Sequence, residues 1–174
     1  MSTFEGILEK EKSEWLAYLD KARELTGVDE SKSIKLTFEK RKSLIEIQVP
    51  QGRLSSALYD TSININPEVC EVETSSNFKL ISLSHELGEY HRSCSPIIII
   101  HSLFLWPWPK YKERYVNKLV HNKLVANYGE TEAKRMMRGF VGEWLSFPNK
   151  NSVSENYVKS YIEKCMPFLI EQIK

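Results

Sequence analysis

Hydrophobic and polar positions alternate along this chain with two different periods, which predict one helix, then short strands, then more helices. Apolar residues recur at helical spacing over residues 3–26, and Gly27 follows as a stop signal. From Ser33 to Asn66 the period shortens to two residues, which is typical of strands. We expect three short strands here, and Pro67 ends the last of them.

The helical period returns after the strands and continues to the end of the chain. We expect four further helices, over residues 77–92, 111–128, 130–147 and 154–174. Pro167 should break the last of these helices, and Ser75, Ser76 or Asn77 is positioned to cap the first. This order predicts an α+β fold with an N-terminal helix, a small three-stranded antiparallel sheet, a helix pair and a C-terminal helical lobe.

Composition and charge narrow the class of protein. The chain has 174 residues, of which 41% are hydrophobic and 27% charged, and this suits one domain with an accessory helical lobe. A net charge of +1 argues against a nucleic-acid-binding protein, since such proteins are strongly basic. The three cysteines form no C-x-x-C pair, so neither a disulfide framework nor a zinc ribbon is indicated.

The N-terminus and the longest apolar run bear on location. The first residues lack the charged-then-apolar pattern of a secretory signal. The most apolar stretch, from Ile97 to Trp108, is far shorter than the roughly 20 residues that a membrane helix needs. We therefore expect a cytoplasmic protein without a membrane-spanning segment.

Candidate chemistry is concentrated in one segment of the helix predicted over residues 77–92. A helix turns by about 100° per residue, so His85 and Glu89, four residues apart, share one face. The apolar residues of the opposite face should pack on the sheet: Leu80, Leu83, Leu87 and Tyr90. An imidazole and a carboxylate at this spacing can reach one metal ion. Glu86, next to His85, is where a glutamate would activate water at a zinc site.

Glu113 is the second candidate, because it stands at the start of an otherwise apolar stripe of the helix predicted over residues 111–128. The stripe continues through Val116, Val120 and Leu124. Burying a carboxylate without a partner is costly, and either a metal ion or a cationic side chain would remove that cost. His121 lies on the flank of the stripe, where it faces either the rim of a site or solvent.

Each of these residues also has an ordinary interpretation. His85 and its neighbours fit the polar side of a surface helix, since short HExx matches arise by chance. Glu113 fits a salt bridge with one of four basic residues: Lys110, Lys112, Arg114 or Arg92. The other histidines, His91, His101 and His121, fit ordinary polar or capping roles. Cys94 fits a buried or unreactive thiol.

The order of three segments resembles the ImmA/IrrE family of metallopeptidases, a gluzincin-like group common in mobile genetic elements. In that family an extended INP segment precedes an HExxH helix, and a second helix carries a glutamate ligand. Here Tyr59–Pro67 matches the first segment, His85–Glu89 the second, and Glu113 with the apolar residues after it the third. The resemblance implies a zincin-like metallopeptidase domain over residues 1–130, followed by a C-terminal helical lobe over 131–174.

The resemblance implies metal-ligand roles for His85 and Glu113 and a general-base role for Glu86. One departure is that the second histidine of the family is Glu89 here, so the motif is HExxE. Glu89 then takes a ligand position with a carboxylate donor. A His/Glu/Glu set is harder than His/His/Glu, so it should hold zinc less selectively and tolerate manganese or iron. A degenerate site would hold no metal.

We therefore expect a metal-dependent peptidase-like protein that acts on a protein or peptide, for example a repressor or another regulatory protein. The alternative is a catalytically inactive module of the same fold that binds a protein partner. The apolar segment Ile97–Pro109 would form either a satellite core or a lid or partner surface. A DNA-associated regulator is a third interpretation, against which the near-neutral charge argues.

Overall fold

The computed structural model describes residues 4–29, 33–40, 45–48, 61–70, 73–94, 109–146 and 155–169. Its contacts divide the chain into two compact units, Met1–Tyr90 and His91–Lys174, which are described one at a time below. The first unit contains the sheet and the described part of the second is helical, so the α+β class predicted from the sequence is confirmed. Within the described residues, every helix is too short or too polar to cross a lipid bilayer.

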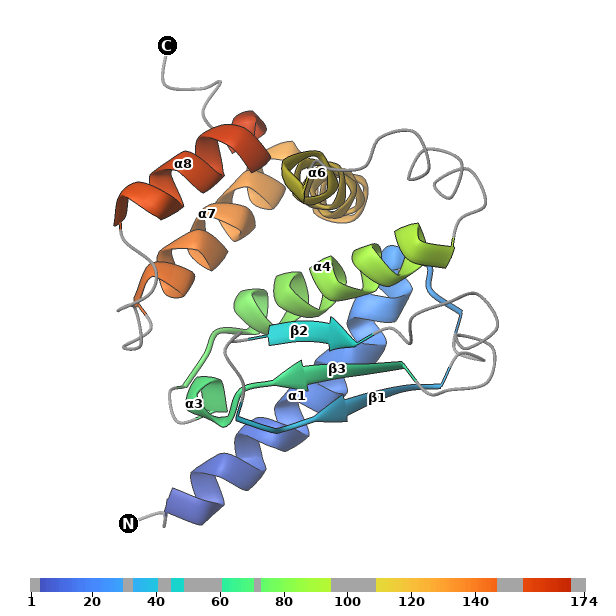
Figure 1. Ribbon diagram of the computed structural model, residues 1–174, viewed down its shortest axis with the longest axis vertical. Helices are drawn as coiled ribbons and strands as arrows, with labels where there is room; N and C mark the ends of the chain where they lie inside the picture. The colour runs from blue at the N-terminus through green and yellow to red at the C-terminus, as the bar shows by residue number, and fades with distance from the viewer. Residues whose placement is uncertain are drawn as a thin grey trace. The chain divides into compact units, whose positions relative to one another are not determined.

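The first unit combines helices with a small sheet (Figure 1). Its elements in chain order are α1 (Phe4–Thr26), β1 (Ile34–Thr37), β2 (Ile45–Gln48), β3 (Thr61–Ile65), α3 (Pro67–Cys70) and α4 (Ser76–Cys94). The predicted helices over 3–26 and 77–92 and the three predicted strands are thereby confirmed. The short helix α3 was not predicted.

The sheet is mixed, and the predicted all-antiparallel arrangement is wrong. β3 lies in the centre, in the order β1-β3-β2. β2 pairs with it antiparallel, with Ile45 opposite Ile65, whereas β1 pairs with it parallel, with Leu36 opposite Ile63. Successive side chains of a strand point to opposite faces of the sheet, so consecutive buried residues show a strand covered on both faces. β3 is covered in this way, because Ile63, Asn64 and Ile65 are consecutive buried residues.

Two asparagines satisfy backbone groups around the end of β3. The Asn64 side chain accepts from Thr37 Oγ1 at 3.0 Å and from the Glu39 N–H at 2.9 Å, and its Nδ2 donates to the Glu39 carbonyl at 2.9 Å. Asn66 Oδ1 accepts the backbone N–H two residues on, at 3.1 Å, and so caps α3, whose first residue is Pro67. Interpreting Pro67 only as the end of a strand therefore overlooked a helix start.

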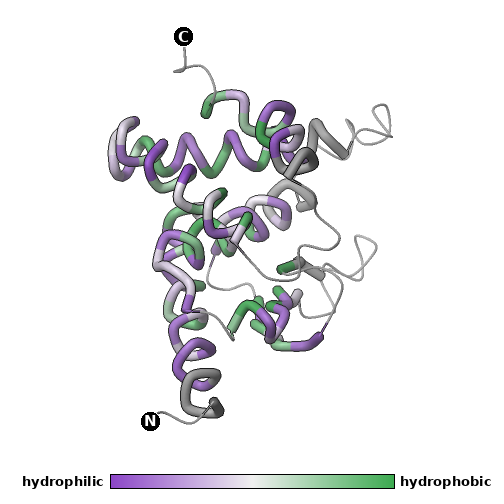
Figure 2. Tube along the Cα trace, turned by 90° about the vertical axis from the view of Figure 1, so that its left-hand side faces the viewer, coloured by the Kyte–Doolittle hydropathy of each residue, from purple (hydrophilic) through white to green (hydrophobic). Residues whose placement is uncertain are grey.

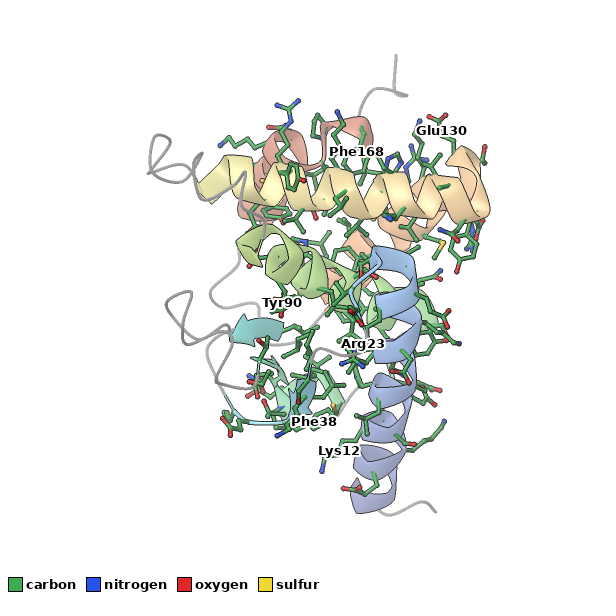
Figure 3. The ribbon with its side chains drawn as sticks, turned by 90° about the vertical axis from the view of Figure 1, so that its right-hand side faces the viewer. Lys12, Arg23, Phe38, Tyr90, Glu130 and Phe168 are labelled. Carbon is green, nitrogen blue, oxygen red and sulfur yellow. The ribbon has the colours of Figure 1, made fainter. Side chains whose placement is uncertain are left out.

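α1 is amphipathic, with hydrophilic and hydrophobic residues alternating along it (Figure 2). Its buried apolar residues are Trp15, Leu19, Ala22 and Leu25. The helix runs along one face of the sheet (Figure 3). Arg23 Nη2 donates to the carbonyl oxygen of Ile34 at 3.3 Å, and the Lys12 ammonium lies 5.8 Å from the centre of the Phe38 ring.

A buried ion pair joins α4 to α1. Lys79 and Glu11 are 0% and 2% exposed, and Lys79 Nζ lies 3.2 Å and 3.1 Å from the two carboxylate oxygens of Glu11. Lys79 also donates to Glu14. Burial acts to lower the pKa of Lys79, but the hydrogen bonds and charges of Glu14 and Glu11 outweigh burial and raise it. Beside this pair, Trp15 packs edge-on against Phe78 with ring centroids 6.3 Å apart.

The helix ends follow the predicted signals. Gly27 (φ 75°) and Gly129 (φ 83°) adopt the left-handed conformation, and each donates its N–H to the carbonyl four residues earlier, at 2.8 Å and 2.9 Å. Ser75 Oγ accepts the N–H three residues on, at 3.1 Å, and caps α4. Of the three cap candidates, Ser75 therefore fills the role.

The described part of the second unit consists of α6 (Pro109–Tyr128), α7 (Glu130–Ser146), α8 (Glu155–Cys165) and the 3-10 helix η2 (Pro167–Leu169). α6 contacts both α7 and α8. The predicted helices over 111–128 and 130–147 and the break at Pro167 are confirmed. The predicted apolar stripe of α6 is buried at Val116, Val120 and Leu124.

Two predictions stay untested by this fold. The assignment of residues 1–130 to a zincin-like domain and of 131–174 to a separate lobe stays a prediction. The apolar segment Ile97–Pro109 lies outside the described residues, apart from Pro109 as the first residue of α6.

Replacing Lys79 with methionine should destabilise the protein by about 3–5 kcal/mol, because it leaves the Glu11 carboxylate buried without its cation. Urea denaturation of Lys79→Met and wild type measures this difference. The matched control is Lys10→Met, which removes an exposed partner of Glu14 at 3.7 Å and should cost less than about 1 kcal/mol. The double variant Lys79→Met/Glu11→Leu should recover most of the loss. Equal effects of Lys79→Met and Lys10→Met would contradict this account of the ion pair.

Candidate functional site

The second half of α4 presents the first candidate residues. Every residue from Phe78 to Ser84 is buried, whereas His85, Glu86 and Glu89 are half-buried. The predicted opposite face is buried: Leu80, Leu83, Leu87 and Tyr90. His85 Nε2 lies 3.8 Å from Glu89 Oε1, one helical turn along. The prediction that these two side chains share a face of the helix is therefore confirmed.

Two further polar residues, Glu86 and Ser82, lie near His85 on α4. Glu86 directly follows His85 and is turned by about 100° from it around the helix axis. Ser82 lies three residues before His85, is 5% exposed, and its Oγ has no hydrogen-bond partner in the described part of the chain.

Glu113, on α6, is half-buried, and its carboxylate accepts a hydrogen bond from a phenol. Tyr161 Oη, on α8, donates to Glu113 Oε2 at 2.9 Å. Asn117, one turn after Glu113 on α6, donates from Nδ2 to the same Tyr161 oxygen at 3.0 Å. The carboxylate therefore ends a chain of two hydrogen bonds within the second unit. A basic residue or a metal ion was the predicted partner of Glu113, and Tyr161 was not predicted.

The environment of Tyr161 keeps its hydroxyl as a donor. Burial raises the pKa of Tyr161 well above its ordinary value, and the charge of Glu113 raises it further. Trp144, on α7, packs edge-on against the Tyr161 ring with centroids 5.2 Å apart. The phenol is therefore protonated at neutral pH, and its ring is supported by a neighbouring helix.

His121, which was expected at a site rim or in solvent, is instead a core residue of the second unit. It is 8% exposed and stacks on Phe168, with ring centroids 4.3 Å apart. Its Nε2 has no hydrogen-bond partner within the described residues. Burial lowers the pKa of His121, the positive charge of Lys134 lowers it further, and Glu130 acts in the opposite direction. Phe168 and Glu130 are labelled in Figure 3.

The remaining histidines, basic residues and cysteines named from the sequence do not add to this site. The side chains of His91, Arg92, Cys94, Lys110 and Lys112, and all of His101, lie outside the described residues. Arg114 is exposed on α6. Cys70 and Cys165 are buried free thiols.

The donor chemistry of His85, Glu89 and Glu113 suits a divalent cation. Each is half-buried and offers one ligand atom, an imidazole nitrogen or a carboxylate oxygen, so this set could hold a metal ion. In the first unit the imidazole and one carboxylate already lie within 4 Å of each other. In the second unit the Glu113 carboxylate is held by a hydrogen bond, as metal-ligating carboxylates commonly are.

Comparison of the chain with models of known protein families, with curated proteins and with solved structures found no match. The resemblance to the ImmA/IrrE family stays a prediction that rests on the three matching segments.

The stability of the second unit should fall as the pH falls below about 6.5, the ordinary pKa of histidine. The pKa of His121 is lowered in the folded state, so the unfolded chain binds a proton more readily and acid favours unfolding. Denaturant titrations of wild type and His121→Gln at pH 7.5 and 5.5 measure this effect. Wild type should lose more of its free energy of unfolding between these two pH values than His121→Gln does. Equal losses in the two proteins would show that His121 is not the group responsible.

Proposed function

We propose that this chain is a metal-dependent peptidase-like protein in which His85, Glu89 and Glu113 hold one divalent cation. The observation that carries the proposal is the donor set itself: a half-buried imidazole and carboxylate 3.8 Å apart on α4, and a half-buried, hydrogen-bonded carboxylate on α6. The proposal requires Glu113 of the second unit to reach the same cation as His85 and Glu89. The order of the three resembling segments supports the same ligands.

The metal follows from the donor types. One imidazole with two carboxylates suits zinc, manganese or iron(II), and the second carboxylate reduces the preference for zinc over the harder ions. A divalent cation held by these residues would supply Lewis-acid polarisation of a peptide carbonyl. The two carboxylates would offset the positive charge of the ion and weaken that polarisation.

Glu86 is the residue that we assign to proton transfer. It is half-buried, directly follows His85, and is turned to one side of the face that carries the two proposed ligands. A carboxylate there would accept a proton from the attacking water and donate it to the leaving amine of a peptide. The resemblance points to a regulatory protein, such as a repressor, as the substrate.

Wild type should bind close to one equivalent of zinc or manganese, and Glu89→Gln and Glu113→Gln should each weaken binding by more than about 100-fold. Loss of an outer partner of a ligand already costs about 10–100-fold, and these variants lose a ligand itself. Equilibrium dialysis with metal analysis gives the affinities. Matched controls are Glu24→Gln and Glu163→Gln, exposed carboxylates in the first and second unit, which should bind like wild type. A folded wild type that takes up neither metal would refute the site.

A further variant tests whether the three ligand positions converge on one ion when the carboxylate of Glu89 is replaced by an imidazole. Glu89→His restores the two-histidine pattern of the resembling family and should bind zinc more tightly than wild type. If Glu89→His binds no zinc, the ligands do not converge.

Glu86→Gln should bind metal as wild type does but hydrolyse unfolded protein substrates about 10²–10⁴ times more slowly, since that is the usual contribution of a general base. The measurement is peptide release from a panel of denatured proteins with metal-loaded wild type and Glu86→Gln. Equal rates in the two proteins would remove Glu86 from the mechanism. Metal binding by a wild type that releases no peptides would favour the alternative, an inactive module that binds a protein partner.

A further inference from the structure

Tyr161 lies in the C-terminal segment over 131–174, for which the sequence indicates no role. Its hydroxyl stands between Glu113 Oε2, at 2.9 Å, and Asn117 Nδ2, at 3.0 Å. These two residues precede it by 48 and 44 positions. The hydrogen bonds therefore join α8 to α6 at the position of a proposed metal ligand.

The direction of this hydrogen-bond chain follows from the groups themselves. An ionised carboxylate has no hydrogen to give, so the single hydroxyl hydrogen of Tyr161 must point to Glu113. The Asn117 amide must then donate to the phenol oxygen, since that oxygen's own hydrogen is already used. Asn117 thus selects the hydroxyl orientation that serves Glu113.

Packing holds the phenol ring in place as well. Trp144, on α7, contacts the Tyr161 ring edge-on at 5.2 Å between centroids, with an interplanar angle of 84°. A tyrosine side chain has few rotatable bonds, so a ring held in this way places its hydroxyl with little freedom. α6, α7 and α8 together therefore determine where the donor to Glu113 stands.

We propose that Tyr161 is a positioning residue that orients the Glu113 carboxylate for the metal ion, so that full metal affinity requires the C-terminal helices. This inference rests on the function proposed above. Ligating carboxylates are commonly oriented by a hydrogen bond from outside the ligand set. Tyr161 supplies that bond from a different helix, which makes the C-terminal lobe part of the site rather than an attachment to it.

Tyr161→Phe tests the inference because it removes the hydroxyl and keeps the ring that packs on Trp144. We expect it to weaken zinc or manganese binding by about 10–100-fold, while metal-free Tyr161→Phe unfolds as cooperatively in urea as metal-free wild type. The absorption spectrum of the cobalt(II)-loaded protein should also change, because a reoriented carboxylate alters the ligand field. The matched control is Tyr115→Phe, at an exposed tyrosine of α6, which should change neither affinity nor spectrum.

The outcomes separate this inference from the proposed function. If wild type binds metal, and Tyr161→Phe binds it with the same affinity and cobalt spectrum, Tyr161 does not position Glu113 and the metal site stands. If wild type binds no metal, the proposed site fails and the role of Tyr161 fails with it. If Tyr115→Phe weakens binding as much as Tyr161→Phe, the effect does not arise from the hydrogen bond to Glu113, and the inference is overturned.

Discussion

The buried ion pair between Lys79 and Glu11 fixes how α4 lies against α1 in the first unit. Both side chains are almost fully removed from water, and an ammonium or carboxylate there is tolerable only while its partner stays in place. Because Lys79 is on α4 and Glu11 on α1, the pair holds the two helices in one register. His85 and Glu89 follow Lys79 on the same helix, so the ion pair sets their position relative to the rest of the unit.

In the second unit, hydrogen bonds orient the candidate metal ligand Glu113. The Glu113 carboxylate accepts a hydrogen bond from the Tyr161 hydroxyl, which in turn accepts one from the Asn117 amide. The Lys79 ammonium brings a positive charge to its carboxylate partner, whereas a phenol orients a carboxylate without bringing a charge of its own. Lys79 and Glu11 therefore join two helices, whereas the Tyr161 hydroxyl orients the carboxylate of a candidate metal ligand.

Local features of the fold could be predicted because their causes are local. The helix ends at Gly27 and Gly129, the cap at Ser75 and the break at Pro167 all depend on residues within one turn of the feature. The shared face of His85 and Glu89 depends only on helical geometry. The stripe of α6 was predictable for the same reason.

The features that could not be predicted depend on residues far apart in the chain. The parallel pairing of β1 with β3 depends on which strand occupies the centre of the sheet, and strand periodicity carries no information on that choice. The partner of Glu113 lies 48 residues away, and no local pattern marks Tyr161 as its donor. His121 was misplaced because its stacking partner Phe168 belongs to a separate helical segment.

Anomalous diffraction at the zinc absorption edge, from crystals grown with zinc, tests the proposed metal site most directly. The account predicts one strong peak about 2.0–2.2 Å from a nitrogen of His85 and from carboxylate oxygens of Glu89 and Glu113. A peak coordinated from one unit alone, or no peak at these residues in zinc-saturated crystals, would contradict it.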